Sequence, residues 1–365
     1  MRIVMLSKAL VVGAHQRKLE VLGGLRDVDL TCVVPPAWGD QRLEPLFLNG
    51  YRLAIRPIRF NGNFHLFHFS ALGRLLREVE PDIVHVDEEP YNLATFLATR
   101  QAVAVGARPL FFTWQNLRRR YPPPFRWMER YVFRSARCAI AGSAEAGDVL
   151  RWKGYRGPVA IIPQFGIDPE LFAPRADRPE DGAFAVGYAG RLVAEKGLFV
   201  LLDALTGLGG SWRLTLLGDG PLRTELATRA RVLGIDRRVT LEPAVPSVEI
   251  PRRLARLDVL VLPSVTRPNW KEQFGRVLIE AMASEVPVIG STSGEIPNVI
   301  GDAGLIFPEA DPAALRASLQ RLAADPALRA ELGRRGRARV LERFTHERIA
   351  NQTLEVYRRM MAGVE

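Results

Sequence analysis

The sequence predicts an α/β protein made of two doubly wound, parallel-sheet domains, for three reasons. At 365 residues, the chain is long for a single hydrophobic core. Short runs rich in β-branched residues alternate with longer helical patterns, which is typical of parallel sheets covered by helices. The strand-like runs also fall into two successive groups of six, and each group predicts one domain.

The predicted strands follow one another along the chain with helical patterns between them. The first group comprises Ile3–Leu6, Val28–Val34, Asp82–Val86, Leu110–Thr113, Cys138–Ala141 and Val159–Ile162. The second group comprises Ala185–Tyr188, Arg213–Leu217, Val239–Leu241, Val259–Leu262, Val286–Ile289 and Gly304–Phe307.

A proline-rich segment separates the two groups. Pro169, Pro174 and Pro179 fall within it, and proline breaks regular structure. We therefore place an N-terminal domain at residues 1–172 and a C-terminal domain at 173–344.

Three later positions predict helix starts. Asp311 and Asp325 each precede a proline, and an acidic N-cap before a proline at the first helical position is a common start. Thr345 is expected to cap a last helix that runs toward Met361.

The composition describes an ordinary globular protein, with 47% hydrophobic and 25% charged residues. Only Cys32 and Cys138 are present, which argues against a disulfide scaffold or a zinc site and fits a reducing cytoplasm. The five histidines show no metal-binding spacing, so no bound metal is expected. The N-terminus reads as a buried strand interrupted by Lys8 rather than as a signal peptide, and no apolar run could span a membrane.

The positive charge is concentrated in the first half of the chain. Residues 1–175 hold 24 Lys and Arg against 16 Asp and Glu, whereas the remainder holds 26 against 24. Such a charge suits an anionic membrane surface, an anionic acceptor or a nucleic acid. A general excess of surface arginine would give the same numbers.

The stretch from Glu272 to Glu280 is the most informative in the chain. Phe274, Gly275 and Arg276 form a predicted turn that leads into a helical run, and a helix N-terminus presents backbone N–H groups that suit phosphate. If most of the intervening steps are helical, the two carboxylates lie ~12 Å apart, at about 1.5 Å per residue. A glycosidase with paired carboxylates needs only about 5 to 9.5 Å. The spacing instead suits an elongated ligand with hydroxyls at both ends and a diphosphate between them.

Two cations follow the first strand of the second group, in Gly190-Arg191-Leu-Val-Ala-Glu-Lys196. A pyrophosphate leaving group needs cations, because negative charge grows on its oxygens as the bond breaks. The alternative is a pair of solvated surface side chains. Gly218-Asp-Gly-Pro lacks the third glycine of a dinucleotide fingerprint, so hydride transfer is not expected.

These motifs resemble the retaining glycosyltransferases of family 4, which have the GT-B fold of two Rossmann-like domains facing across a cleft. The resemblance rests on Gly-Arg…Lys, Gly-Asp-Gly-Pro, Leu-Pro-Ser, Glu-x7-Glu with Phe-Gly, and Gly-Glu-Ile-Pro, which occur in this order in the second domain. It implies catalysis without a metal or other cofactor, and a last helix, 345–365, that returns to the first domain.

The resemblance also implies roles for single residues. Glu272 would orient the donor sugar, Glu280 would hold the ribose, and Arg191 with Lys196 would stabilise the leaving pyrophosphate. The remaining expected donor contacts come from the predicted turn and two glycine loops: Phe274, Gly275, Arg276, Gly190 and Gly13.

The first domain departs from the family pattern on the acceptor side. Glu88 stands where members often have histidine, although the following Glu89-Pro90 is kept, and Gln115 also replaces a common histidine. Glu88, Glu89 and His85 are the candidate acceptor-side residues, because open α/β sheets bind ligands at the carboxyl ends of strands. For His85, a buried, hydrogen-bonded strand histidine is the competing interpretation.

The stretch from Arg118 to Arg130 interleaves arginines with Tyr121, Phe125 and Trp127. Aromatic side chains beside cations suit a membrane interface or an anionic lipid, or stacking on single-stranded nucleic acid. Against both, three prolines predict an irregular loop and Trp127 could belong to the core. We treat peripheral contact with the inner face of the membrane as a hypothesis and do not expect nucleic acid as a partner.

Together these features predict a glycosyltransferase that moves a sugar from a nucleoside-diphosphate-sugar donor to a hydroxyl acceptor, which could be a lipid, a glycan or a small molecule. One alternative is a nucleotide-sugar epimerase of the same fold, which would need histidines that residues 173–344 lack. Another is a non-catalytic protein that binds a nucleotide or lipid. The donor base, donor sugar and acceptor are not readable from the sequence.

Overall fold

The computed structural model describes residues 1–174 and 182–363, so Pro179 and the last two residues of the predicted C-terminal helix lie outside the described residues. The chain divides into two compact units. The first unit comprises Met1–Gly166 together with the C-terminal helix α13 (His346–Ala362). The second unit is Ile167–Thr345, so it begins before residue 173, where the prolines suggested the boundary.

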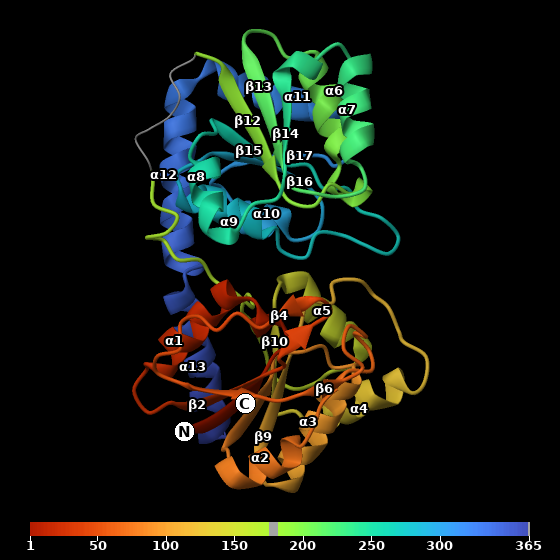
Figure 1. Cartoon of the computed structure of the whole chain (residues 1–365), viewed down its shortest axis with the longest axis vertical. Coiled ribbons are helices and arrows are strands. Elements are labelled where there is room, and N and C mark those ends of the chain that lie inside the picture. The colour runs from red at the N-terminus through yellow and green to blue at the C-terminus, as the bar shows by residue number, and fades with distance from the viewer. Residues whose placement is uncertain (175–181, 364–365) are drawn as a thin grey trace. The chain divides into compact units, whose positions relative to one another are not determined.

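The first unit contains a seven-stranded parallel sheet in the order β11-β10-β9-β8-β1-β2-β5 (Figure 1). Its strands are β1 (Arg2–Leu6), β2 (Asp29–Val34), β5 (Arg52–Ile55), β8 (Ile83–Val86), β9 (Arg108–Thr113), β10 (Cys138–Ala141) and β11 (Val159–Ile161).

Five further helices and two small hairpins accompany this sheet. The helices are α1 (Arg17–Gly23), α2 (Leu72–Val79), α3 (Leu93–Ala104), α4 (Phe125–Ser135) and α5 (Ala144–Lys153), with the 3-10 helices η1 (Ala9–Val11) and η2 (Gly13–Gln16). The hairpin strands are β3 (Ala37–Trp38), β4 (Gln41–Arg42), β6 (Ile58–Arg59) and β7 (His68–Phe69).

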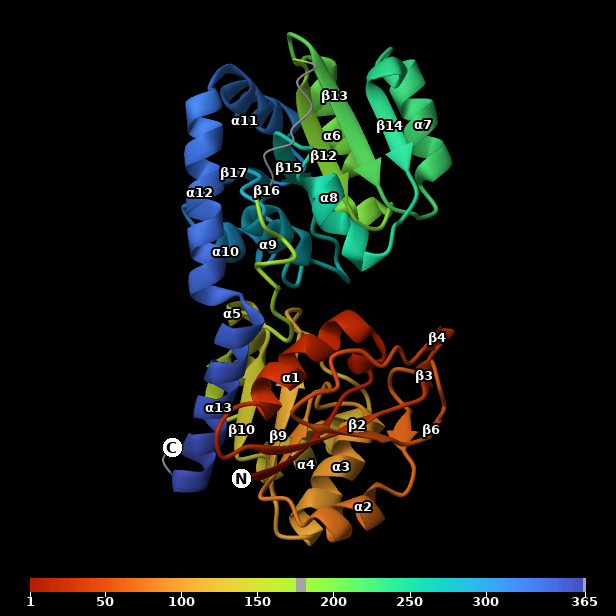
Figure 2. The same cartoon turned by 60° about the vertical axis from the view of Figure 1, so that its left-hand side comes forward.

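Both faces of the first sheet are covered, as a parallel sheet requires. Successive residues of β1 show this directly, because Ile3 and Met5 pack in a core cluster with α1 and α13, whereas Val4 and Leu6 pack with α2 and α3. Figure 2 shows α13 and α1 on one side of the sheet and α2 and α3 on the other.

The second unit contains six parallel strands, as predicted, and their order in the sheet is β14-β13-β12-β15-β16-β17. The strands are β12 (Phe184–Ala189), β13 (Trp212–Leu217), β14 (Val239–Glu242), β15 (Val259–Leu262), β16 (Val288–Ser291) and β17 (Leu305–Phe307). The helices are α6 (Leu198–Thr206), α7 (Arg223–Val232), α8 (Ile250–Leu254), α9 (Arg276–Ala283), α10 (Ile296–Ile300), α11 (Pro312–Ala324) and α12 (Pro326–Arg343), with η3 (Ala194–Lys196), η4 (Asp236–Arg238) and η5 (Ser247–Glu249).

Two of the predicted helix caps are confirmed. The Asp311 carboxylate accepts hydrogen bonds from Ala313 N and Ala314 N at 2.9 Å, and Asp325 accepts one from Leu328 N at 2.9 Å. The helix α13 begins directly after Thr345.

Three details of the first unit differ from the sequence prediction. The edge strand β5 was missed, because half of its residues are exposed and arginine opens it. The expectation of an irregular loop up to Arg130 was wrong beyond Pro124, since α4 begins at Phe125. A core position for Trp127 was also wrong, because this side chain is 62% exposed.

Candidate functional site

The second unit contains a cavity of about 630 Å³ at the carboxyl ends of β12, β13 and β15. The strand order reverses between β12 and β15, and open α/β sheets bind ligands at such a switch point. The lining comes from the segments that follow these strands and from the start of α9: Ala189–Arg191, Lys196, Leu217–Asp219, Ala244, Val245, Ile250, Leu262, Glu272, Gly275–Val277 and Glu280.

The predicted turn before α9 is confirmed, and it requires glycine. Gly275 has φ of +79°, and a Cβ at this position would lie 2.9 Å from Leu262 Cδ2. The helix starts at Arg276, so its first turn faces the cavity with N–H groups that the helix itself does not use. These groups and the positive end of the helix dipole suit an anion.

The two acids of the motif sit on different kinds of structure. Glu280 belongs to α9, whereas Glu272 precedes the helix in an extended segment. The condition for a ~12 Å helical spacing is therefore met only in part, because only half of the eight steps, those from Arg276 to Glu280, lie within the helix at about 1.5 Å per residue. Both carboxylates nevertheless line the same cavity.

Glu272 and Lys196 form an ion pair at the rim of the cavity. The Lys196 Nζ donates to Glu272 Oε2 at 2.6 Å, and the hydroxyl of Ser264 donates to the same oxygen at 2.7 Å. The ring of Trp270 lies beside the ammonium, with its centroid 5.1 Å from Lys196 Nζ. The expected sugar-binding acid and an expected phosphate-binding cation thus form an ion pair with each other.

Glu280 has a similar partner one helical turn away. The Arg276 Nε lies 3.0 Å from Glu280 Oε1, and the Glu280 side chain is 15% exposed. Burial raises the pKa of Glu280, and the neighbouring Arg276 opposes this rise. A ligand that offers hydroxyl donors would stabilise this carboxylate in its charged form.

Arg191 differs from the other two cations of the cavity. Its side chain is exposed and forms no ion pair with any of the residues that the structure describes. The hydroxyl of Tyr188 donates to the Arg191 carbonyl at 2.8 Å and fixes this loop. Gly218 packs so closely that a Cβ there would lie 2.0 Å from the Gly190 oxygen, so Gly-Asp-Gly-Pro shapes the cavity wall. Arg191 is therefore available to an incoming anion.

The first unit buries three consecutive acidic residues, Asp87, Glu88 and Glu89, in a polar network. Glu88 is ion-paired with Lys8 and also accepts a hydrogen bond from Lys8 N at 2.8 Å. Glu89 accepts hydrogen bonds from Thr113 Oγ1 at 2.6 Å and from Trp114 N at 2.7 Å. Burial raises the pKa of Glu88, although Lys8 opposes the rise, and burial raises the pKa of Glu89 to about 7 despite its two donors.

His85 fits the structural interpretation of the sequence. It is 2% exposed, and its Nδ1 lies 2.7 Å from the hydroxyl of Tyr357 on α13. Burial lowers the pKa of His85 to about 4, against the opposing charge of Asp87. The side chain is thus neutral at pH 7 and ties α13 to the sheet. Gly13 also lies in the first unit, where it begins η2, and its approach to a donor stays a prediction.

Sequence reasoning missed several side chains that shape these sites. Trp270 gave no signal, because a single tryptophan in a loop carries no pattern. Ser264 was visible only as the end of Leu-Pro-Ser. Lys8 was recognised only as an interruption of the first apolar run, and Lys153 gave no signal, although Lys8 pairs with Glu88 and Lys153 pairs with Glu129 at 2.5 Å.

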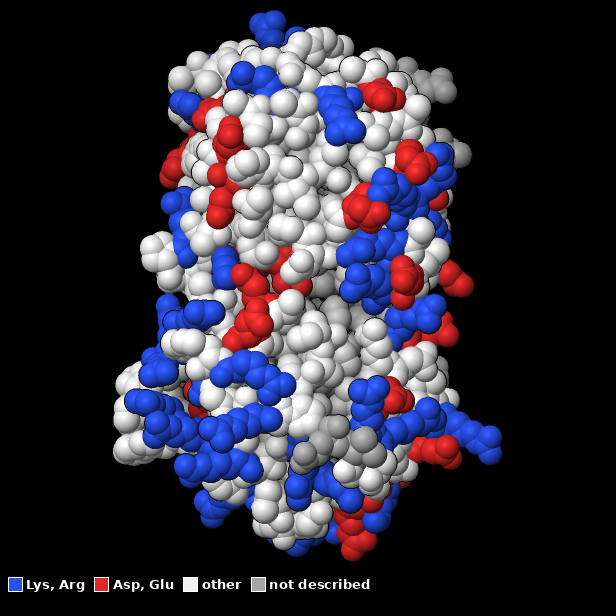
Figure 3. Space-filling model, turned by 180° about the vertical axis from the view of Figure 1, so that it is seen from behind, with Lys and Arg blue, Asp and Glu red and all other residues white. Residues whose placement is uncertain are grey.

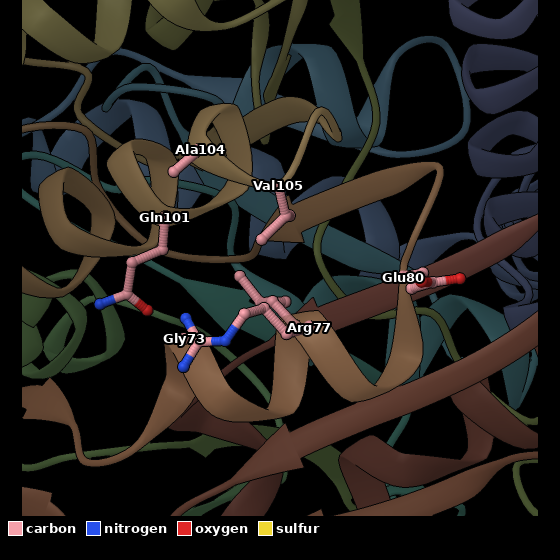
Figure 4. A pocket seen from close by; sticks show the side chains of 7 residues that line it. Gly73, Arg77, Glu80, Gln101, Ala104 and Val105 are labelled. Atoms are coloured by element: carbon pink, nitrogen blue, oxygen red, sulfur yellow. The ribbon is translucent and has the colours of Figure 1, made fainter.

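A second cavity, of about 340 Å³, lies between the C-terminal parts of α2 and α3 in the first unit. Figure 4 shows the side chains of Arg77 and Gln101 extending toward one another there. Both helices end near the amino ends of β8 and β9, opposite the edge where open α/β sheets bind ligands. Within residues 1–174 and 182–363, no group of three or more histidine, cysteine or acidic side chains is arranged to hold a metal ion.

Comparison with known proteins agrees with this arrangement. Residues 173–339 match the family model for glycosyl transferases group 1, and residues 24–171 match the model for glycosyltransferase family 4. The α-maltose-1-phosphate synthase of Mycolicibacterium smegmatis is 30% identical over 262 residues, which cover 65% of this chain and 66% of that protein. The chain spans about half to two thirds of the length of that protein and of two other curated glycosyltransferases that it resembles.

Two solved structures resemble the whole chain. Sucrose-phosphate synthase from Thermosynechococcus elongatus superimposes with a TM-score of 0.74 at 22% identity and full coverage of both chains. Anabaena HepE, solved in complex with UDP and glucose, superimposes with a TM-score of 0.73 at 20% identity and covers 98% of this chain and 99% of its own. At these identities the likeness shows the fold. With both family models matched in succession, the chain belongs to the group 1, family 4 glycosyltransferases and has their GT-B fold of two Rossmann-like domains.

Proposed function

We propose that this protein transfers a sugar, with retention of its anomeric configuration, from a nucleoside-diphosphate-sugar donor to a hydroxyl acceptor. One observation carries the proposal: Arg191, Lys196, Glu272, the start of α9 and Glu280 line a single cavity at the switch point of the second sheet. Cations and helix N–H groups suit a diphosphate, and the two acids suit the hydroxyls of a sugar and of a ribose. The complex of Anabaena HepE with UDP supports a nucleotide as a ligand of this fold.

Each side chain has a distinct role in the proposed reaction. The bond between the anomeric carbon and the β-phosphate oxygen breaks, and its electron pair stays on the phosphate. Arg191 and Lys196 stabilise that growing charge, and the first turn of α9 adds its N–H groups. The acceptor oxygen forms the new bond on the same face of the sugar, and its proton passes to the leaving phosphate.

Two ion pairs of the cavity involve cations that a diphosphate would contact. Lys196 is held by Glu272 and Arg276 by Glu280, so the cations are neutralised until a diphosphate competes for them. Arg191, exposed and without an ion pair among the described residues, is the side chain that would meet the diphosphate first. As donor binds, Glu272 is released to accept hydrogen bonds from the sugar. We expect no metal or other cofactor to take part.

A thermal-shift panel tests the proposal. UDP, GDP, ADP and their common sugar conjugates are added to the wild type and to the Glu280→Ala variant. The wild type should be stabilised by one nucleotide series, since a ligand that binds only the folded state raises its melting temperature. The variant should show a clearly smaller shift with the same series. Absence of any shift in the wild type, or an equal shift in the variant, would refute the assignment.

Two other activities are distinguishable by product analysis. An epimerase would return an altered nucleotide sugar without an acceptor, but residues 167–345 contain no histidine to serve as an acid or base. A non-catalytic binding protein would give a thermal shift without releasing nucleoside diphosphate. The complete set of cations and acids in one cavity favours the transferase.

The acceptor is proposed to bind to the first unit. Glu88 and Glu89 lie just after β8, at the carboxyl edge of the first sheet, where an acceptor hydroxyl would bind. Glu89, with its raised pKa, could both accept and donate a hydrogen bond near pH 7. We assign His85 a structural role.

We also propose that the protein acts on the cytoplasmic side and that an anionic membrane surface is one of its partners. Across residues 1–174 and 182–363, no helix has the length and apolarity required to cross a bilayer. Any membrane contact of this part of the chain would therefore be peripheral. A lipid, a glycan and a small molecule are all acceptors compatible with this proposal.

A further inference from the structure

The helix α4 exposes a tryptophan and a row of arginines along one side. Trp127, Arg130 and Arg134 are all exposed, and their spacing of three and four residues places them on one face of a helix. Trp127 is 62% exposed, more than any other tryptophan that the structure describes. We name these three residues, with Arg126 beside them, the α4 face.

Among the described residues of α4, only one side chain is acidic, and of the residues of the α4 face it interacts electrostatically with Arg126. The one acid within the helix, Glu129, is buried and pairs with Lys153 at 2.5 Å. Neither Arg130 nor Arg134 forms a salt bridge with a residue in the described ranges. The opposite side of the helix is fixed, because Val132 belongs to a core cluster with Tyr155, and the partly buried Phe133 packs against the same cluster. The outward side chains are therefore not needed to hold the helix in place.

The segment before α4 extends the same surface. Arg118, Arg119 and Arg120 are exposed, and the Arg120 guanidinium lies 4.8 Å from the centroid of the Trp152 ring. Figure 3 shows a dense gathering of Lys and Arg at the left of the first unit, on the side where Figure 1 places α4. Exposed arginines thus occur both in the segment that follows β9 and on α4.

We propose that the α4 face and the Arg118–Arg120 segment form a docking surface for an anionic lipid bilayer. Each cation near an anionic bilayer strengthens binding roughly five-fold, and exposed tryptophan prefers the headgroup region, where its ring is buried and its N–H stays hydrated. A single-stranded nucleic acid would need bases stacked on accessible rings. Among the aromatic side chains of residues 118–134, all of which are described, only Trp127 is exposed. Tyr121 stacks on Tyr91 with centroids 4.1 Å apart, and Phe125 packs against His65 at 5.0 Å.

The docking surface and the donor cavity are in different units, so this inference stands or falls independently of the proposed reaction. It nevertheless bears on the acceptor. Thr113 and Trp114, at the end of β9, bind Glu89, and the arginine segment begins only four residues further on. A bilayer held by this surface would lie near the proposed acceptor edge of the same unit.

Sedimentation with lipid vesicles tests the proposal on the full chain. Vesicles of phosphatidylcholine alone are compared with vesicles containing about a third phosphatidylglycerol, at 50 mM and 500 mM salt. The wild type should bind the anionic vesicles at low salt and should lose most of this binding at high salt, because exposed charges are screened. Absence of binding to anionic vesicles at low salt would overturn the proposal.

Two variants and a matched control locate the surface. Arg130→Glu with Arg134→Glu should weaken vesicle binding at least tenfold, and Trp127→Ser should weaken it severalfold. Arg231→Glu with Arg237→Glu makes the same change of charge at exposed positions of the second unit and should bind like the wild type. Equal binding by the α4-face variants and this control would contradict the assignment.

Further readouts separate docking from misfolding and from nucleic-acid binding. The α4-face variants should keep the wild-type thermal shift with nucleoside diphosphate, since that cavity lies in the second unit. In the wild type, vesicles should shift tryptophan emission to the blue and protect it from iodide, and Trp127→Phe should reduce both effects. If the protein bound a single-stranded oligonucleotide at a salt concentration at which vesicles were not bound, a nucleic acid would replace the bilayer as the partner.

Discussion

Replacing Glu272 by glutamine should affect nucleotide binding and sugar transfer in opposite directions. The Glu272 carboxylate accepts a hydrogen bond from Lys196 Nζ at 2.6 Å, and the two side chains are only 9% and 19% exposed. A diphosphate must draw Lys196 away from this partner. Glutamine keeps the shape of the side chain and an oxygen for the Ser264 hydroxyl, but it removes the competing charge.

The expected magnitudes follow from the electrostatics of the pair. At an effective dielectric constant of about 20, unit charges ~3 Å apart attract by roughly 5 kcal/mol before desolvation is counted. In the variant a diphosphate no longer has to break this attraction. If about 1–2 kcal/mol of it is thereby added to the free energy of binding, the nucleoside diphosphate should bind ~5- to 30-fold more tightly to the variant. Loss of charged hydrogen bonds to the sugar should cost about 2–4 kcal/mol of transition-state stabilisation, so kcat/KM should fall ~30- to 1,000-fold.

Calorimetric titration with the nucleoside diphosphate that stabilises the wild type measures the first effect, and release of that nucleotide from its sugar conjugate measures the second. Glu195→Gln is the matched control, because it removes one negative charge from the loop that carries Lys196 but does not line the cavity. Weaker nucleotide binding by Glu272→Gln, or undiminished transfer, would refute the assigned role of the pair. An equal increase in nucleotide affinity in the Glu195→Gln control would show that the effect comes from a general change in charge.

Four further predictions concern other parts of the two units. Arg191→Ala should weaken nucleoside-diphosphate binding by about 1.5–3 kcal/mol, the typical value of a hydrogen bond to a charged group, and Arg191→Lys should restore part of the loss; titration that finds wild-type affinity in Arg191→Ala would contradict this role. Gly275→Ala should destabilise the second unit by about 1–3 kcal/mol in urea unfolding, because φ is +79° and the new Cβ would crowd Leu262; an unchanged urea midpoint would show that the turn relaxes. Burial raises the pKa of Glu89 to about 7 from its ordinary value near 4.5, so its contribution to stability is present below pH 4.5 and is lost as pH rises through 7. The free energy of unfolding of the wild type should therefore fall by up to ~3 kcal/mol relative to that of Glu89→Gln between pH 5 and 8. Parallel pH profiles of the two proteins would disprove the shift. Asp325→Ala should cost about 0.5–2 kcal/mol through the lost cap of α12, which a thermal melt should show as a lower melting temperature.

The sequence predicted those features that depend on local pattern. The six strands of the second unit were recognisable because each is a short apolar run, and Asp311 and Asp325 were recognisable as caps because their partners lie within three residues. The edge strand β5 escaped notice because its exposed residues break the apolar run. The α4 helix escaped notice because three prolines directly precede it.

The contacts that define the site could not be predicted in the same way. Lys196 and Glu272 are 76 residues apart in the chain, and no local pattern shows that they pair with each other. The same holds for Glu88 with Lys8, which are 80 residues apart, and for Trp270 beside Lys196. The motifs predicted which side chains line the cavity, whereas the ion pairs between them are visible only in the folded structure.

The cavity of the second unit is proposed above all to hold the diphosphate of a sugar donor. Calorimetric titration of the wild type and of Arg191→Ala with UDP, GDP and ADP tests this role most directly. We expect one saturable site per chain for at least one of the three nucleotides, and about 10- to 150-fold weaker binding of that nucleotide to the variant. Binding of none of the three to the wild type, or equal binding to both proteins, would contradict it.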